Sequence, residues 1–291
     1  FSRRNAHGYM PSLTEYSMLP CMKSRHIAVC SWSLKPKSPI ELVSGCQSCG
    51  ISSIQLALLP LVYDTAWKGC VEILQDVGIS VHSGMLEASG EDYTTLESIA
   101  KTSGLRRDET WVSTLENAKR VGDIAAEMGL PLVTFHAGFI AEEQCGERTK
   151  MLDRLHELTE EFANRGLQLG LETGQERAEN VASVLQELSL PQLGVNFDPA
   201  NMILYGKGNP IEAIETLQPW VQQVHIKDAK HTQLQGTWGT EVPVGEGDVD
   251  WEAFFKFVPE DVNLVIEREG GEHRIEDIQK AKAMLEDLGV C

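Results

Sequence analysis

The sequence predicts a single-domain (β/α)8 barrel over residues 25–291. Short apolar segments alternate with helix-like segments along nearly the whole chain, which is typical of a parallel sheet. Eight such units occupy about 265 residues, the length of one closed barrel. A doubly wound open sheet is the alternative, but its glycine-rich phosphate-binding turn after the first strand is missing.

The first half of the chain contains four predicted units. The predicted strands are residues 26–34, 51–59, 79–85 and 132–136, and the helices are residues 39–49, 64–77 and 111–128. Asp64 is the expected N-cap of the second helix, and Gly129 closes the third. Residues 87–109 form a long acidic and polar connection, and connections of this length inside compact domains are often functional lids.

The second half contains the helix of the fourth unit, residues 147–164, and four more units. The predicted strands are residues 167–172, 193–198, 221–226 and 263–267, and the helices are residues 147–164, 178–188, 210–217, 251–257 and 272–288. Gly166 stands at the C-terminal stop of the helix that precedes the fifth strand. The glycine-rich segment 227–249 reads as a loop, with Trp238 as a candidate lid residue.

Residues 1–24 match nothing in this pattern. They contain two prolines, show no hydrophobic periodicity and lack the apolar core of a signal peptide. We interpret them as a leader outside the barrel.

Composition narrows the function classes. Hydrophobic residues make up 42% of the chain, enough for a large core, and no apolar run reaches membrane-spanning length. The 25 basic and 43 acidic residues give a net charge of −18, which disfavours nucleic acid as a partner. We therefore expect a small-molecule substrate and no membrane partner. The subunit count is left open, a homo-oligomer included.

Cysteine usage favours a reducing, cytoplasmic location. The seven cysteines are odd in number and scattered through a long chain, unlike a disulfide framework. Cys46 and Cys49 have CxxC spacing, but no second pair accompanies them, so they cannot complete a tetrahedral zinc site. We interpret this pair as structural.

Four polar residues stand at the ends of late strands: Glu172, Asp198, His225 and Glu267. In a parallel barrel these ends meet at one mouth, where ligands bind. Taken alone, each acid is more often a helix cap or an ion-pair partner. Three carboxylates together would repel one another unless a cation joined them, so the set favours a divalent metal. Carboxylate oxygens with one imidazole nitrogen suit Mn²⁺, Mg²⁺, Co²⁺ or Zn²⁺.

Five motifs in fixed order carry a family resemblance. They are GLETGQE (170–176), VNFDPAN (195–201), VHIKD (224–228), VPVGEGDVDW (242–251) and VIEREGG (265–271). Residues 26–290 resemble the xylose isomerase-like TIM barrel superfamily of sugar isomerases, epimerases and inosose dehydratases. The superfamily also contains AP endonucleases of the endonuclease IV type.

The resemblance implies a metal-dependent isomerase or epimerase. Glu172, Asp198, His225 and Glu267 resemble the metal ligands, and Glu172 and Glu267 resemble the two groups that move the substrate proton through a metal-stabilised enediolate. An inosose-type dehydratase, a metal-dependent phosphodiesterase of the endonuclease type and a non-enzymatic sugar-binding barrel are the alternatives. Asn201, His231 and Ala178 stand where ketose 3-epimerases have histidine, arginine and glutamate, which implies different contacts to the substrate.

Five further residues are candidates for substrate binding. His136 ends the fourth strand, Trp32 ends the first, and Lys227 follows His225 by two residues; Asn201 and Gln175 lie just beyond two of the acids. His136 could equally be a hydrogen-bonded residue lining the barrel, Trp32 a structural residue at the rim, and Lys227 an exposed loop lysine.

Overall fold

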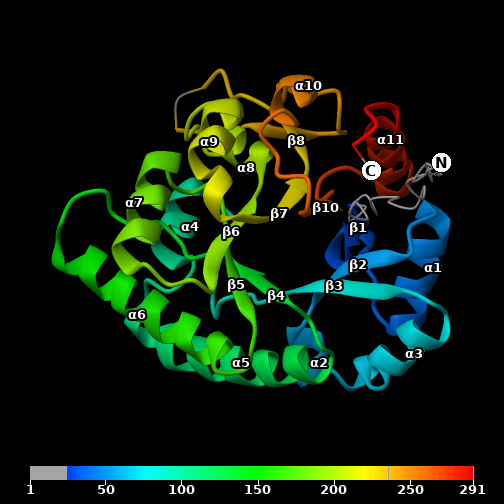
Figure 1. The fold of residues 1–291 in the computed structure, drawn as a ribbon, viewed down its shortest axis with the longest axis horizontal. Coiled ribbons are helices and arrows are strands. Elements are labelled where there is room, and N and C mark those ends of the chain that lie inside the picture. Colours follow the sequence, from blue (N-terminus) through cyan, green and yellow to red (C-terminus); the bar gives the residue numbers. More distant parts are fainter. Residues whose placement is uncertain (1–24, 235, 291) are drawn as a thin grey trace, which may run out of the picture.

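The computed structural model describes residues 25–234 and 236–290, so the predicted leader lies outside the described residues. Eight parallel strands close into a barrel in the order β1-β10-β7-β6-β5-β4-β3-β2, and helices surround it (Figure 1). The predicted (β/α)8 barrel is therefore confirmed.

The barrel strands are short. Each pairs with the barrel strand before it and the one after it in the chain, and the last strand, β10, closes the ring against β1. The strands are β1 Ile27–Cys30, β2 Ser53–Ala57, β3 Ser80–Met85, β4 Leu132–Phe135, β5 Gln168–Glu172, β6 Leu193–Phe197, β7 Val221–Ile226 and β10 Asn263–Ile266. The parallel pairing brings all eight carboxyl ends to one mouth.

Seven helices pack around the barrel: α1 Pro39–Cys49, α3 Cys70–Asp76, α5 Asp108–Glu127, α6 Gly146–Ala163, α7 Ala178–Leu188, α9 Pro210–Leu217 and α11 Arg274–Asp287. Helix α1 matches its predicted bounds because its signals are strong. Ser38 accepts a hydrogen bond from the Glu41 amide as N-cap, Pro39 occupies the first turn, and Gly50 closes the helix at φ 64°.

The structure corrects two of the predicted elements. Residues 26–34 are not one strand, because β1 ends at Cys30 and a 3-10 helix, Ser31–Leu34, follows. Residues 64–77 are not one helix: Asp64 caps the 3-10 helix Thr65–Trp67 through the Ala66 amide, and α3 begins only at Cys70. Gly69 lies between them at φ 75°, a conformation that an α-helix cannot contain.

Four short helices sit in the connections: α2 Leu59–Tyr63, α4 Leu96–Thr102, α8 Pro199–Leu204 and α10 Trp251–Phe254. The segment 227–249, expected as a loop, contains the antiparallel hairpin of β8 Asp228–Lys230 and β9 Thr240–Val242. Helices α2, α4 and α8 were not predicted; they and the hairpin follow the carboxyl ends of strands and therefore build the rim of the mouth. Helix α10 was predicted as residues 251–257, ends earlier, at Phe254, and packs beside α9.

The main apolar core lies between the strands and the helices, where Phe135, Phe162, Phe197 and Phe254 are fully buried. The inside of the barrel is different, because hydrogen bonds cross it. The Ser83 hydroxyl on β3 donates to Gln223 on β7, and His225 on β7 contacts Gln55 on β2. Since buried polar groups need partners, this cross-barrel network fixes the strands relative to one another.

Asp228 organises the hairpin and the glycine-rich turn behind it. Its carboxylate, 1% exposed, accepts hydrogen bonds from the amides of Ala229, Gly245, Gly247 and Val249 and from the indole of Trp251. A Cβ on Gly247 would lie 1.9 Å from an Asp228 oxygen, so the turn requires glycine there.

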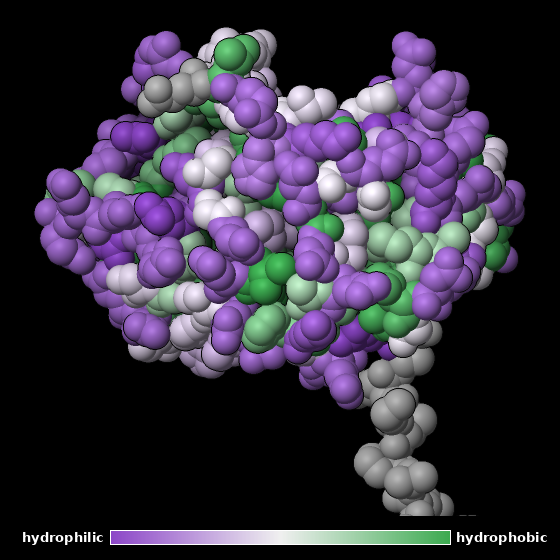
Figure 2. Space-filling view, turned by 90° about the horizontal axis from the view of Figure 1, so that it is seen from above, coloured by the Kyte–Doolittle hydropathy of each residue, from purple (hydrophilic) through white to green (hydrophobic). Residues whose placement is uncertain are grey.

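The surface is hydrophilic over most of the face seen in Figure 2, and the hydrophobic residues on it form small, separate patches. The large apolar side chains that are exposed are scattered: Ile40, Tyr63, Val77, Tyr93, Val112 and Leu234. In the part of the chain that the structure describes, no helix has both the length and the apolar character needed to cross a membrane.

We expect Asp228→Ala to lower the free energy of unfolding by about 3 kcal/mol, because it leaves several buried N–H groups without an acceptor. Asp250→Ala is the matched control, since Asp250 accepts one bond, from the Ala253 amide, as N-cap of α10, and its loss costs about 1 kcal/mol. Urea denaturation of both variants checks the difference. Equal losses would contradict the role of Asp228.

Candidate metal centre

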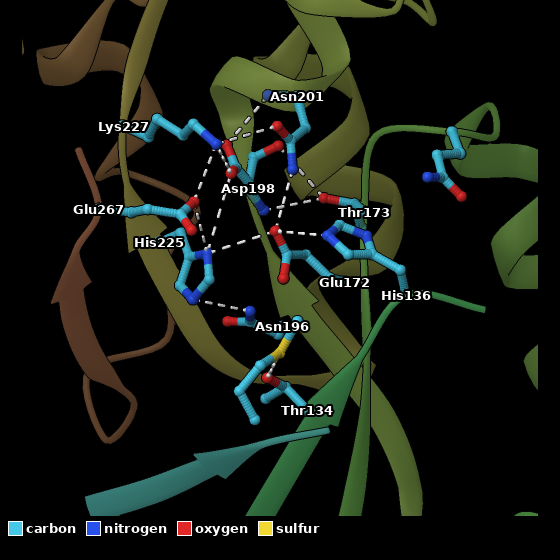
Figure 3. A network of polar contacts seen from close by, with 12 residues as sticks. Thr134, His136, Glu172, Thr173, Asn196, Asp198, Asn201, His225, Lys227 and Glu267 are labelled. Atoms are coloured by element: carbon cyan, nitrogen blue, oxygen red, sulfur yellow. Dashed lines mark hydrogen bonds and ion pairs between the residues drawn. The ribbon is translucent and has the colours of Figure 1, made fainter. Parts of the chain in front are cut away.

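Four buried side chains meet at the carboxyl ends of β5, β6, β7 and β10. Glu172, Asp198, His225 and Glu267 are each 0–5% exposed and offer ligand atoms that all lie within 4.8 Å of one another. His225 Nδ1 lies 3.5 Å from Glu172 Oε1, 3.8 Å from Asp198 Oδ2 and 3.3 Å from Glu267 Oε2 (Figure 3). The sequence prediction brought these same four residues together. We call them the carboxylate–histidine cage.

Local structure holds Asp198 rigidly. Its Oδ1 caps α8, accepting from the amides of Ala200 at 2.8 Å and Asn201 at 3.0 Å. Thr173, which follows β5, bonds to the Asp198 amide and carbonyl through its hydroxyl. The helix-cap interpretation of Asp198 is thus correct, and it leaves Oδ2 free to face the cage.

The unsatisfied atoms of the cage fit a bound cation. Glu172 Oε2, Asp198 Oδ2 and His225 Nδ1 are buried and have no hydrogen-bond partner. Buried polar atoms of native proteins seldom lack a partner, and a metal ion between Asp198 Oδ2 and His225 Nδ1 would satisfy these two. Oxygen-rich donors with one imidazole form a donor set that binds divalent ions.

The charges point the same way. Burial raises the pKa of Asp198 to about 6 against the opposing effect of Lys227. Burial also acts to raise the pKa of Glu267, but Lys227 and His225 outweigh it and hold that pKa well below its ordinary value. Three buried carboxylates therefore share this small space with one buried ammonium, Lys227, and a divalent ion would reduce their mutual repulsion.

Lys227 is a buried ammonium at the edge of the cage, not an exposed loop lysine. It is 3% exposed and lies 3.0 Å from Glu267 Oε2, 2.7 Å from Glu269 Oε2 and 3.8 Å from Asp198 Oδ2. Burial disfavours its charge, but these carboxylates raise its pKa well above the ordinary value. It is a fixed cation beside the candidate metal position.

His136 and Asn201 support Glu172 from the other side. Asn201 Nδ2 donates to Glu172 Oε1 at 3.0 Å, and His136 Nε2 lies 3.4 Å from the same oxygen. His136 Nδ1 is buried without a partner. The amide oxygen of Asn201 accepts from Lys227 at 3.4 Å, so this side chain links the two flanks of the cage.

A cavity of about 630 Å³ opens above the cage. Trp32 lines it and donates its indole N–H to Glu267 Oε1 at 2.6 Å. The wall has an apolar and aromatic part and an acidic part. The apolar residues are Leu59, Pro60, Met85, Tyr93, Leu204, Tyr205 and Trp238, and the acidic residues outside the cage are Glu87, Glu91 and Glu269.

The sequence prediction missed several lining residues. Glu87, Glu91 and Tyr93 come from the segment 87–109 that was expected to be functional, but a connection carries no periodicity that could single them out. Leu204 and Tyr205 belong to the unpredicted α8 and its C-terminal end. Tyr205 packs against Trp238 with ring centroids 4.9 Å apart, which anchors the candidate lid residue.

Of the five residues predicted to bind the substrate, Gln175 is the one that the structure places outside the cavity lining. It is 2% exposed, does not line the cavity, and its amide lies 3.5 Å from the Tyr205 hydroxyl. Cys46 and Cys49 lie in α1, buried in the core, and join none of the clusters of metal-ligand residues found in residues 25–234 and 236–290.

The family comparison covers most of the chain. The family model described as xylose isomerase-like TIM barrel matches residues 45–288. A xylose isomerase domain protein from Planctomyces limnophilus superposes with a TM-score of 0.78 at 31% identity, over 84% of this chain and 91% of that one.

Two solved structures below 25% identity share the fold. One is a xylose isomerase-like TIM barrel protein from Mycobacterium smegmatis in complex with magnesium, with a TM-score of 0.70, 16% identity and coverage of 91% and 96%. The other is the Escherichia coli 3-keto-D-glucoside 4-epimerase, with a TM-score of 0.67, 18% identity and coverage of 92% and 100%.

Two curated relatives match over shorter stretches. The uncharacterized protein YihM of Escherichia coli is 32% identical over 96 residues, which are 32% of this chain and 29% of that protein. The 3-oxo-isoapionate decarboxylase of Pectobacterium atrosepticum is 29% identical over 114 residues, 37% of this chain and 41% of that protein. Both alignments thus span less than half of the relatives' own length.

Glu176, a buried acid near the cage, should make the stability of the protein depend on pH. Its carboxyl is 8% exposed and accepts from the Ile140 amide, and burial raises its pKa from 4.5 to about 7. In the unfolded chain the Glu176 carboxyl ionises near pH 4.5, whereas in the native protein it stays protonated up to about pH 7. The native state therefore loses stability relative to the unfolded state as the pH rises from 4.5 to 7, by about 1.4 kcal/mol for each unit by which the pKa is raised.

We therefore expect Glu176→Gln to gain stability over the natural protein progressively across this pH interval, with a constant difference above it. Glu179→Gln, an exposed position on α7, is the control and should give a flat difference. Urea denaturation at a series of pH values measures both. A Glu176→Gln difference independent of pH would contradict the buried protonated carboxyl.

Proposed function

The chain belongs to the xylose isomerase-like TIM barrel family, and on this premise we propose that it is a divalent-metal-dependent isomerase or epimerase. Its substrate is a small sugar or sugar-like carbonyl compound, and the reaction is a proton transfer at the carbon next to the carbonyl. The observation that carries the proposal is the cage, in which two glutamates from non-adjacent strands face one imidazole across a buried centre.

Glu172, Asp198, His225 and Glu267 would hold the ion. Three carboxylates and one imidazole favour Mn²⁺ or Mg²⁺, with Co²⁺ and Zn²⁺ as alternatives. When bound, the ion supplies a Lewis acid that acidifies the carbon-bound proton and stabilises charge on the carbonyl oxygen. This contribution matters because a carboxylate with a lowered pKa is a weak base.

Glu172 and Glu267 are the proposed catalytic residues. Burial acts to raise the pKa of Glu172, but His136 and His225 outweigh it and lower the pKa, so the group is ionised and able to accept a proton. Strands β5 and β10 are separated by β6 and β7 in the barrel, so the two carboxylates approach a substrate from different sides. One can remove the proton and the other can return it.

The residues around the cage are proposed to bind the substrate. Lys227 donates to the substrate oxygen that becomes negative, and His136 and Asn201 hold substrate hydroxyls beside Glu172. Trp32 packs against the sugar ring. Gln175 acts through Tyr205. The aromatic and apolar wall suits the C–H face of a sugar.

An inosose-type dehydratase is the second candidate. The buried ammonium of Lys227 favours it, because a proton donor beside the cage could assist the departure of a neighbouring hydroxyl. The acidic cavity lining gives less support to a phosphodiesterase of the endonuclease type, whose substrate is a polyanion.

We also propose a reducing, cytoplasmic location. Cys30, Cys46, Cys49 and Cys70 are buried free thiols, and burial raises the pKa of each, which leaves them inert.

Metal content tests the proposal directly. Elemental mass spectrometry of protein purified without added metal should find about one divalent ion per chain, and the double variant Glu172→Ala/Asp198→Ala should lose it. Two or three zinc ions would favour the hydrolase instead. A protein that binds no ion even after incubation with Mn²⁺ would refute the proposal.

Proton exchange tests the catalytic assignment. Ketoses and inososes are screened in deuterated water for incorporation at a carbon next to the carbonyl, and Glu172→Gln or Glu267→Gln should slow exchange by about 10²–10⁴-fold. Glu269→Gln is the matched comparison, because Glu269 also bonds to Lys227 but is not part of the cage. This substitution should slow exchange less than either cage variant does. Full exchange in either cage variant would contradict the assignment.

A further inference from the structure

Two sets of neighbours surround His225, one at each ring nitrogen. Nδ1 faces the three carboxylates of the cage. Nε2 faces the barrel interior, where it lies 2.7 Å from Gln55 Oε1, 3.0 Å from Asn196 Nδ2 and 3.8 Å from the thiol of Cys30. Only one nitrogen of a neutral imidazole can offer a lone pair to a cation, and the hydrogen bond at the other nitrogen decides which one.

The orientation of the Gln55 amide is fixed by its own partners. Its Nε2 lies 2.6 Å from the Thr134 hydroxyl and 3.5 Å from the Gly84 carbonyl, which can only accept. The Thr134 hydroxyl donates to Met85 Sδ at 3.1 Å, so it accepts from Gln55. The amide oxygen of Gln55 must then point at His225.

Asn196 is the second close neighbour of His225 Nε2. Gln223 donates to Asn196 Oδ1 at 3.2 Å, which turns the Asn196 amide nitrogen toward His225. An amide nitrogen donates and does not accept, so Asn196, 3.0 Å away, favours a lone pair on Nε2. Gln55 Oε1 can only accept and is closer, at 2.7 Å, so it favours a proton there and is the stronger of the two opposing contacts. Gln55 and Thr134 are 0% exposed, and water cannot replace them.

We propose that Gln55 is a positioning residue that selects the tautomer of His225 with its proton on Nε2, and so directs the Nδ1 lone pair into the cage. The proposal rests on the proposed function, because it assumes that the cage binds a divalent ion. If the proposal is right, the tautomer of His225 decides which of two overlapping sets of ligands binds the ion. The other set, Cys30 with His225 and Glu267, has sulfur in place of two carboxylates and would favour softer ions such as Zn²⁺.

Under this proposal, Gln55 acts directly on His225, and Thr134 acts on Gln55. Gln55 touches His225, whereas Thr134 acts only through Gln55. Outer partners of metal-binding histidines typically contribute 10- to 100-fold to metal affinity. Gln55→Leu should therefore weaken Mn²⁺ binding by about 10- to 100-fold. Thr134→Val, which keeps the side-chain shape but frees the Gln55 amide to turn, should cause a smaller loss.

The test measures the dissociation constant for Mn²⁺ by electron paramagnetic resonance of the free ion. Gln55→Glu keeps an acceptor at the same place and should bind Mn²⁺ no more weakly than the natural protein, whereas a merely structural role would penalise it as much as Gln55→Leu. Ser53→Ala is the control, because Ser53 is on the same strand but bonds to His82, and it should leave the affinity unchanged.

Cobalt spectra give a second readout that does not depend on activity. The Co²⁺-loaded natural protein should show no sulfur-to-cobalt charge-transfer band, since the ion lies on the carboxylate side of His225. Such a band would overturn the assignment, as would Gln55→Leu and natural protein with equal Mn²⁺ affinity. A natural protein that binds no ion would refute the proposed function. A natural protein that binds Mn²⁺ with the same affinity as Gln55→Leu would refute this inference alone.

Discussion

The structure depends on one constraint: three carboxylates are buried within a few ångströms of one another, and their charge must be compensated. Each is held by different contacts. Asp198 caps a helix, Glu172 accepts from Asn201, and Glu267 lies between Trp32 and Lys227. Such an arrangement is costly without a cation, because burying like charges opposes folding. The surrounding residues position the acids but leave Asp198 Oδ2 and His225 Nδ1 without a hydrogen-bond partner.

Polarity extends from this centre into the barrel. Below the cage, Gln55, Asn196, Gln223 and Ser83 connect strands on opposite sides of the ring. The apolar core, by contrast, lies outside the ring, between strands and helices. This division separates two tasks. The outer layer supplies the stabilisation from burying apolar surface, and the interior supplies the alignment of the functional groups.

Much of this could be predicted from the sequence, and the successes and failures have physical reasons. The strand ends Glu172, Asp198, His225 and Glu267 were found because polar residues interrupt apolar runs at regular positions. Helix α1 was found through its caps. The break at Gly69 was missed because the flanking residues keep a helical pattern. Gln55 was missed because a polar residue in the middle of an apolar strand gives no sign of what it faces across a barrel.

The cage and the cavity wall are built from different parts of the chain. The cage side chains come from barrel strands or the residues directly after them, whereas Leu59, Glu91, Tyr205 and Trp238 come from the longer connections and their short helices. Connections tolerate insertion and substitution far better than packed strands do. Evolution can therefore change which molecule is accepted while the reacting centre is inherited intact, and close sequence relatives of this chain need not share its substrate.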